Sequence, residues 1–298
     1  VACAAAEPIL FDGRLPRGYT LRDLDASIGP YLSVVKGAQN ASHAPYSLTP
    51  TQYTTLSPLP PTPLWPAVSP DIPIALTIDN TSIFTPGGSA PQLGFRRTDL
   101  IAQPSAPGAN RTAFNDGMLD AGLTAFHFSV RADEANPLNF THEYQAVWIE
   151  PDDGSHVFDL QIGTPFNTTL ASPNTLRIRT HNGTPLFSTS FSPRTWHNFA
   201  VAVDWPAQTL QTFYSRDAAP LQRVTPVIQN AGALAGSEGQ GDFHVALLKL
   251  PLIDSADTPA EQADVVHFGI QEGGTEGIVF SGVFVERLRG RGELSRGL

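Results

Sequence analysis

Proline and glycine punctuate the whole sequence, and this feature restricts the chain to short secondary-structure elements. There are 27 prolines and 25 glycines among 298 residues. Proline removes a backbone donor and disrupts a helix interior, and glycine weakens helices and strands alike. Nine prolines crowd residues 45–73. Because a central strand cannot lose so many donors, this segment is predicted to be a long surface loop.

Between these breaks, apolar and polar residues alternate with the period of two that is typical of strands. In residues 123–131, Phe126, Phe128 and Val130 share one face and His127 faces the opposite way. Comparable strand patterns cover 72–78, 158–162, 176–180, 199–203, 210–214, 243–250 and 278–285, and short helical patterns cover 21–27 and 259–263. This order predicts an all-β fold, a two-sheet antiparallel β-sandwich of jelly-roll type with long Pro-rich loops and a few short helices.

Composition excludes several classes of partner. The formal net charge is −10 and the sequence pI is near 5.1, which argues against nucleic acid and suits a neutral ligand such as a glucan. Cys3 is the single cysteine, so no internal disulfide or cysteine-rich zinc site can form. No run of about 18 apolar residues exists, so no membrane span is predicted.

The chain carries signals of secretion. Residues 1–8 resemble the end of a signal peptide near its cleavage site, and a flexible mature terminus is the alternative. Six asparagines have Ser or Thr two positions later without an intervening proline, so they are predicted glycosylation sites: Asn40, Asn80, Asn110, Asn139, Asn167 and Asn182. Together these features predict a secreted, extracellular glycoprotein.

The densest polar and aromatic cluster follows the turn at 136–139. It runs through His142, Glu143, Tyr144, Gln145, Trp148 and Glu150. A hairpin with strand 123–131 would bring polar groups of both strands together. Strict alternation puts Glu143 and Gln145 on one side and the other four on the opposite side, unless a bulge re-aims either set. An ordinary strand with one wet face is the simpler interpretation of this pattern.

The cluster also has the residue types that bind sugars, namely an aromatic ring with amide and carboxylate groups. Glycoside hydrolysis requires two carboxyl groups across the scissile bond, so Glu143 would need a partner. The candidates are Asp99, Glu150, Asp159, Glu272 and Glu276. The sequence has no Gly-x-Ser-x-Gly or His-Glu-x-x-His motif. Three histidines could meet in a jelly roll to bind a metal, but neither metal nor cofactor is predicted.

Several segments, in order along the chain, resemble one known family. They are Ile9–Arg14, Tyr31–Gly37, Ser82–Phe84, Gly94–Arg97, His127–Ser129, Pro137–Asn139, His142–Trp148, Trp196–Val201, Gly269–Glu272 and Gly282–Glu286. Together they are similar to glycoside hydrolase family 131, secreted fungal β-glucanases of broad specificity. The resemblance covers most of the chain and implies one catalytic domain over 9–286, between the N-terminal segment 1–8 and an exposed tail at 287–298.

This resemblance implies hydrolysis of β-1,3-, β-1,6- and β-1,4-linked glucans in an open groove, with inversion at the anomeric carbon. Glu143 falls on the glutamate of the His-Glu-Tyr motif. The second acid, after the Phe-Arg-Arg motif, falls on Asp99, where the family carries glutamate. Aspartate is one methylene shorter, which retracts the carboxyl group. The residues expected to line the groove are Arg96, Arg97, His127, Arg131, Gln145, Trp148 and Glu272. The protein is expected to bind β-glucan polysaccharide or oligosaccharide as a monomer.

Two other functions stay open at this stage. The first is a non-catalytic glucan-binding jelly roll with a degenerate acid pair, which the shorter Asp99 favours. The second is a lyase acting on an acidic polysaccharide, with Arg177 and Arg179 holding uronate groups, although the negative net charge argues against it.

Overall fold

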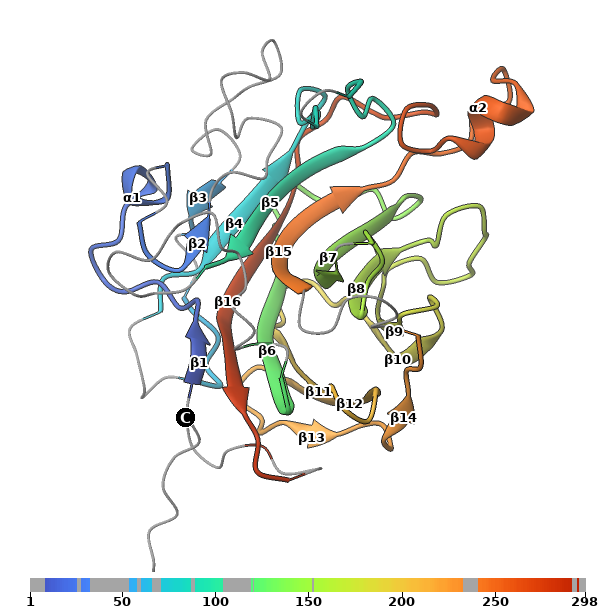
Figure 1. Cartoon of the computed structure of the whole chain (residues 1–298). Coiled ribbons are helices and arrows are strands. Elements are labelled where there is room, and N and C mark those ends of the chain that lie inside the picture. The colour runs from blue at the N-terminus through green and yellow to red at the C-terminus, as the bar shows by residue number, and fades with distance from the viewer. Residues whose placement is uncertain are drawn as a thin grey trace, which may run out of the picture.

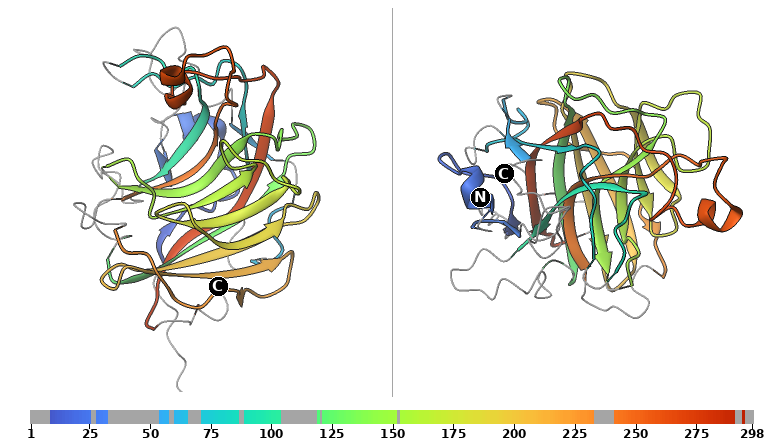
Figure 2. Two further views of the ribbon diagram at one scale, coloured as in Figure 1. Left: turned by 90° about the vertical axis from the view of Figure 1, so that its right-hand side faces the viewer. Right: turned by 90° about the horizontal axis from the view of Figure 1, so that it is seen from above.

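The computed structural model describes residues 9–25, 28–32, 54–57, 60–65, 71–86, 89–103, 119, 121–151, 153–232, 241–290 and 294. Within these ranges the chain forms two antiparallel sheets and two short helices, α1 (Leu21–Asp25) and α2 (Pro259–Ala263). The all-β, two-sheet sandwich predicted from the sequence is therefore confirmed. Helix α2 stands apart from the strands in both views of Figure 2.

The larger sheet has nine strands. Its main path runs in the order β13 (Gln222–Arg223), β12 (Thr209–Arg216), β11 (His197–Asp204), β6 (Leu123–Ala132), β16 (Glu276–Arg287), β4 (Ile74–Ile78) and β3 (Thr54–Leu56). Two further strands, β1 (Ile9–Asp12) and β14 (Ile228–Gln229), pair with β16 and β12. The prediction of a loop throughout residues 45–73 is corrected by β3, which pairs with β4 at the edge of the sheet, where missing donors are tolerated.

The second sheet has seven strands and carries the candidate site. Its order is β10 (Pro185–Ser190), β9 (Thr175–Thr180), β8 (Phe158–Gly163), β7 (Glu143–Pro151), β15 (Gly241–Lys249), β5 (Arg96–Ala102) and β2 (Tyr31–Leu32). Figure 1 shows β15, β7, β8 and β9 following one another across this layer.

The core lies between the two sheets. Phe126 of β6 packs edge-on against Phe158 of β8 and Phe243 of β15, with ring centroids 5.9 and 5.0 Å apart. All three side chains are buried. Edge-to-face pairs of this kind stabilise a core beyond the area that they bury. Apolar side chains at alternate positions of facing strands therefore hold the layers together.

The expected hairpin between strand 123–131 and the Glu143 strand is wrong. Strand β6 pairs with β11 and β16, while β7 pairs with β8 and β15 in the other sheet. Both edges of β6 are occupied, so β7 cannot join it. The turn at 136–139 therefore carries the chain from one sheet to the other.

The C-terminal boundary differs slightly from the expected tail at 287–298. Arg287 is the last residue of β16, and the N–H of Leu288 donates to the carbonyl of Leu123 at 2.9 Å. Leu288 is buried against Ala125 and Ala200 on the outer face of the nine-stranded sheet. The first residues of this segment thus belong to the folded body. Residues 1–8 lie outside the described residues.

Candidate functional site

A bulge in β7 decides which side chains share a face with Glu143. Gln145 pairs with Gln161 of β8, but Val147 pairs with the adjacent Leu160, so Ala146 is an extra residue. Ala146 and Val147 both face the core. Because the alternation shifts here, Trp148 and Glu150 return to the outer face that also carries Glu143 and Gln145, which strict alternation would not have predicted.

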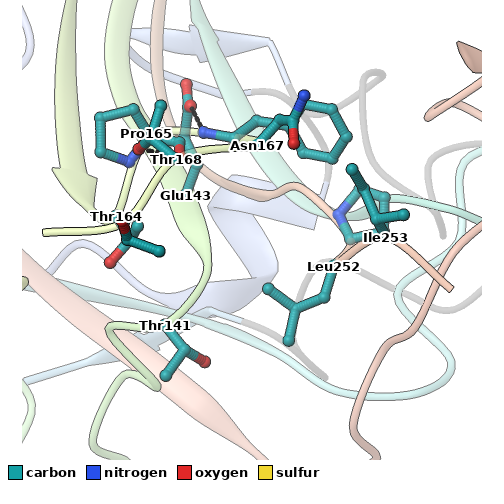
Figure 3. Close-up of a pocket in the computed structure, with 11 residues that line it drawn as sticks. Thr141, Glu143, Thr164, Pro165, Asn167, Thr168, Leu252 and Ile253 are labelled. Carbon is teal, nitrogen blue, oxygen red and sulfur yellow. Dashed lines mark hydrogen bonds between the residues drawn. The ribbon is translucent and has the colours of Figure 1, made fainter. Parts of the chain in front are cut away.

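Glu143 lies at a pocket of about 350 Å³ on this outer face. Figure 3 shows its carboxylate meeting the turn at residues 165–168, with Leu252 and Ile253 across the pocket. The volume is at the lower end of the range of small-molecule sites. The pocket combines threonine hydroxyls with apolar walls, a lining suited to a sugar ring.

The turn beside Glu143 supplies a backbone donor to it. Asn167 has a φ of 57°, and the N–H of Thr168 donates to the carbonyl of Pro165 at 3.1 Å. Asparagine tolerates this left-handed conformation better than most residues. The turn aims the N–H of Phe166 at Glu143 Oε2, 2.7 Å away.

Two side chains bind the other oxygen of Glu143. Gln145 Nε2 donates to Oε1 at 3.1 Å, and Arg179 Nη2 lies 2.9 Å from the same atom. The residue is 5% exposed. Among the described residues, all of these partners are hydrogen-bond donors, and together they contact both oxygens of the carboxylate.

Asp99 lies on the same face but is enclosed. Its carboxylate accepts from Arg97 Nη2 at 2.5 Å and contacts His244 Nδ1 at 2.9 and 3.0 Å, and the residue is 0% exposed. Burial by itself would raise the pKa of Asp99, but the charges of His244 and Arg97 outweigh burial and lower it. Asp99 is thus held as an anion by two basic side chains.

Strand β15 separates the two acids. Asp99 pairs with Ala246, and the carbonyl of Glu143 accepts from the N–H of Leu250, four residues further along β15. Their backbones are therefore offset by about 13 Å along the strands and about 10 Å across them. The two carboxylates belong to one face, but they have separate sets of partners.

Trp148 is not an open sugar platform, which corrects the expectation that its ring lines the groove. His156 stacks on it at 5.3 Å and His244 at 4.8 Å between ring centroids, and Arg97 lies over it at 5.7 Å. Its Nε1 donates to Glu150 at 2.9 Å. Trp148 is therefore a support that fixes the two histidines.

His127 and Arg131 are corrected as well, because β6 belongs to the other sheet. Both point to the outer face of the nine-stranded sheet, opposite to Phe126 and its core neighbours. His127 Nε2 lies 2.8 Å from Glu286 Oε1, and its ring stacks on Phe284 at 4.2 Å. Neither residue can reach the outer face of the seven-stranded sheet.

Arg96 and Glu272 also have structural partners. Arg96 donates to the carbonyls of Leu93 and Phe95, both at 2.8 Å, while Arg97 faces the site. Glu272 accepts from the buried Lys249 at 2.6 Å. It belongs to a network that also holds His142, Glu276, Tyr144 and Asn139.

Sequence reasoning missed the connection from Asp159 to Glu143. Arg179 donates to Asp159 through Nε at 2.8 Å and Nη2 at 2.6 Å, and the same Nη2 lies beside Glu143. The alternating arginines of strand 176–180 were a signal, but they suggested uronate binding. Arg177 instead donates to Gln161 and to the carbonyl of Gly163. Both guanidinium groups are engaged within the protein, which removes the support for a lyase.

Within the described ranges, no cluster of three or more His, Cys, Asp or Glu side chains is placed to hold a metal ion. The helices of this part of the chain are too short and too polar to cross a bilayer.

The fold and this site define a carbohydrate-active β-sandwich. Residues 9–290 match the family model of the glycoside hydrolase 131 catalytic N-terminal domain. The chain belongs to glycoside hydrolase family 131, as its sequence motifs had indicated.

Two solved structures share the fold. The catalytic domain of a GH131 beta-glucanase from Podospora anserina is 24% identical, with a TM-score of 0.67 over 97% of this chain and 98% of that one. The catalytic domain of the family 131 protein from Coprinopsis cinerea is 23% identical, with a TM-score of 0.66 over the same shares. No curated protein matches the chain.

Proposed function

We propose that this protein is a secreted hydrolase of β-glucans that acts on β-1,3, β-1,6 and β-1,4 linkages with inversion. The observation that carries the proposal is Glu143, a carboxylate set into a pocket on the outer face of a sheet in a family 131 catalytic domain. The printed description of the Podospora anserina structure, a beta-glucanase, supports the substrate class.

In this proposal Glu143 is one catalytic carboxyl group and Asp99 is the other. They share one sheet face, and Arg97 and Gln145 lie between them along the pairing with β15. An inverting pair requires its carboxyl groups about 6.5–9.5 Å apart, so the two side chains must lean toward each other over the bound sugar.

A direct assay tests the function. The protein is incubated with laminarin and with cello-oligosaccharides, and reducing sugar is measured. Glu143→Gln is expected to lower the rate at least about 100-fold, because the proton-transfer group is lost. Glu134→Gln, which removes an exposed carboxylate paired with Arg194, is the control for expression and folding. Proton NMR should show the α-anomer released first. Activity that survives in Glu143→Gln would contradict the proposal.

The alternative is a glucan-binding protein without turnover. The enclosure of Asp99 by Arg97 and His244 favours it, since the carboxylate must leave these partners to meet a substrate. Binding of laminarin without release of reducing sugar would identify this alternative.

Secretion and glycosylation are part of the same proposal. Asn80, Asn167 and Asn182 are exposed, while Asn40 and Asn110 lie outside the described residues. Asn139 is partly buried, and its Nδ2, the atom that would carry a glycan, donates to Glu272 at 2.9 Å. Peptide mass spectrometry of the secreted protein tests each position. The chain is proposed to act as a monomer.

A further inference from the structure

Arg179 is shared by two carboxylates, and this arrangement goes beyond a simple ion pair. Two of its nitrogens donate to the two oxygens of Asp159, at 2.8 and 2.6 Å, and Nη2 also contacts Glu143 Oε1 at 2.9 Å. The side chains of the three residues are 12%, 6% and 5% exposed. A bidentate contact of this kind fixes the plane of the guanidinium group.

The strand register shows why Asp159 matters for this contact. Arg179 pairs with Asp159 on β8, and Asp159 pairs with Trp148 on β7. Glu143 lies five residues before Trp148 on β7, so the arginine must extend along the sheet to reach it. Asp159 holds the guanidinium group in this extended direction.

The hydrogen bonds of Glu143 leave one acceptor position. A carboxylate offers about four lone-pair positions, two on each oxygen. Within the part of the chain that the structure describes, Oε1 has two partners, Gln145 and Arg179, and Oε2 has one, the N–H of Phe166. The second position of Oε2 is therefore the one that can receive a hydrogen bond from a water molecule.

We propose that Glu143 is the general base of the reaction through Oε2, and that Arg179, oriented by Asp159, is the residue that positions it. This inference rests on the proposed hydrolase function. In the step, Oε2 takes a proton from water while the water oxygen bonds to the anomeric carbon. The glycosidic C–O bond breaks, and its oxygen takes a proton from the second acid, which in the proposed pair is Asp99 once it has left Arg97 and His244 and taken up a proton.

The role of Glu143 is tested with Glu143→Ala. In the presence of sodium azide, the variant is expected to release α-glycosyl azide from laminari-oligosaccharides, because the anion replaces the activated water. The variant should hydrolyse aryl laminaribiosides with better leaving groups no faster, because the activated water is still missing. Recovery with a good leaving group, without any azide product, would overturn the assignment, because that pattern belongs to a missing acid.

The role of Arg179 is tested with Arg179→Gln, Arg179→Lys and Asp159→Asn. Arg179→Gln is expected to lower kcat about 100-fold with little change in KM, since a misplacement of about 1 Å has this effect. Lysine at this position, or added guanidinium ion with the glutamine variant, should restore part of kcat. The double variant Arg179→Gln/Asp159→Asn should be no slower than Arg179→Gln alone, because Asp159 acts through the arginine.

The matched control is Arg177→Gln, on the same strand and face, whose guanidinium binds Gln161 and Gly163. Guanidinium ion should not restore its activity. Additive losses in the Arg179 and Asp159 variants, or equal rescue of the Arg177 variant, would overturn the positioning role. Wild-type activity on laminarin tests the hydrolase proposal separately. If the wild type is inactive, the proposed hydrolase function is wrong. If the wild type is active and the variants give the contrary results above, only the roles assigned to Glu143 and Arg179 are refuted.

Discussion

Replacing Lys249 should reveal how strongly the site depends on a buried charge network. Its side chain is 1% exposed, and its Nζ lies 2.6 Å from Glu272 and 3.0 Å from Glu276, whose side chain is 9% exposed. Lys249→Met keeps much of the apolar stem but leaves Glu276 without its cation. Breaking a buried ion pair on one side costs about 3–5 kcal/mol, a large part of the 5–15 kcal/mol that stabilises a typical domain.

Urea unfolding at pH 7, followed by tryptophan fluorescence, measures this loss. With a urea m-value of about 3 kcal/mol/M, the midpoint should fall by about 1–1.7 M. The double variant Lys249→Met/Glu276→Gln should recover at least half of the loss, because no unpaired charge stays buried. Arg194→Met is the control, since Arg194 and Glu134 are 78% and 45% exposed and such pairs contribute about 0–1 kcal/mol. A loss for Lys249→Met as small as the control would refute the reasoning.

The same network predicts an acid limit to stability. Burial acts to raise the pKa of Glu272, but the hydrogen bonds from Lys249 and His142 outweigh it and lower the pKa from 4.5 to about 2. Its contribution is therefore complete above about pH 4.5 and is lost as the pH falls through 2. In Lys249→Met this part of the pH dependence should become shallower, because the main cause of the shift is removed.

Two further predictions concern other parts of the fold. Gly163→Ala should lower both stability and activity. Gly163 has a φ of 82°, and an added Cβ would meet the carbonyl oxygen of His142 at 2.2 Å, beside Glu143. Thermal denaturation and the laminarin assay measure the two effects, and unchanged values would contradict the prediction. Burial lowers the pKa of His197 from 6.5 to about 4. Between these two pH values the unfolded chain binds a proton at His197 that the folded chain does not bind. The free energy of unfolding should therefore fall by about 3 kcal/mol from pH 6.5 to 4. Urea midpoints across this range, compared with His197→Phe, measure the effect, and identical slopes would show that His197 is not responsible.

Strands with a clear alternation of apolar and polar residues were predicted from the sequence, and edge strands without it were not. The alternating strands at 158–163 and 197–204 were predicted within a few residues, and so was helix α2 at Pro259–Ala263. Strand β10 at Pro185–Ser190 was missed, because an edge strand is half exposed on both faces and its sequence has little alternation. Short strands such as β13 depend on a neighbour for their pairing and have no pattern of their own.

The candidate site shows where pairing overrides local sequence. Glu143 was chosen from its motif, and the structure places it in a pocket. His127 was joined to it through a hairpin that does not form, because both edges of β6 are already occupied. Trp148 shares the face of Glu143 through a bulge, and such a bulge becomes visible only when the partner strand is present.

The sequence by itself determined the all-β class and the family, because turn residues, alternation and motifs are local properties of the chain. Only the tertiary structure decided which strands share a sheet, and hence which side chains meet. Arg179 reaches Glu143 because β7, β8 and β9 are neighbours in one sheet, and Asp99 meets His244 because β5 and β15 pair. Contacts between strands depend on register and sheet order, which are set by how the whole core packs.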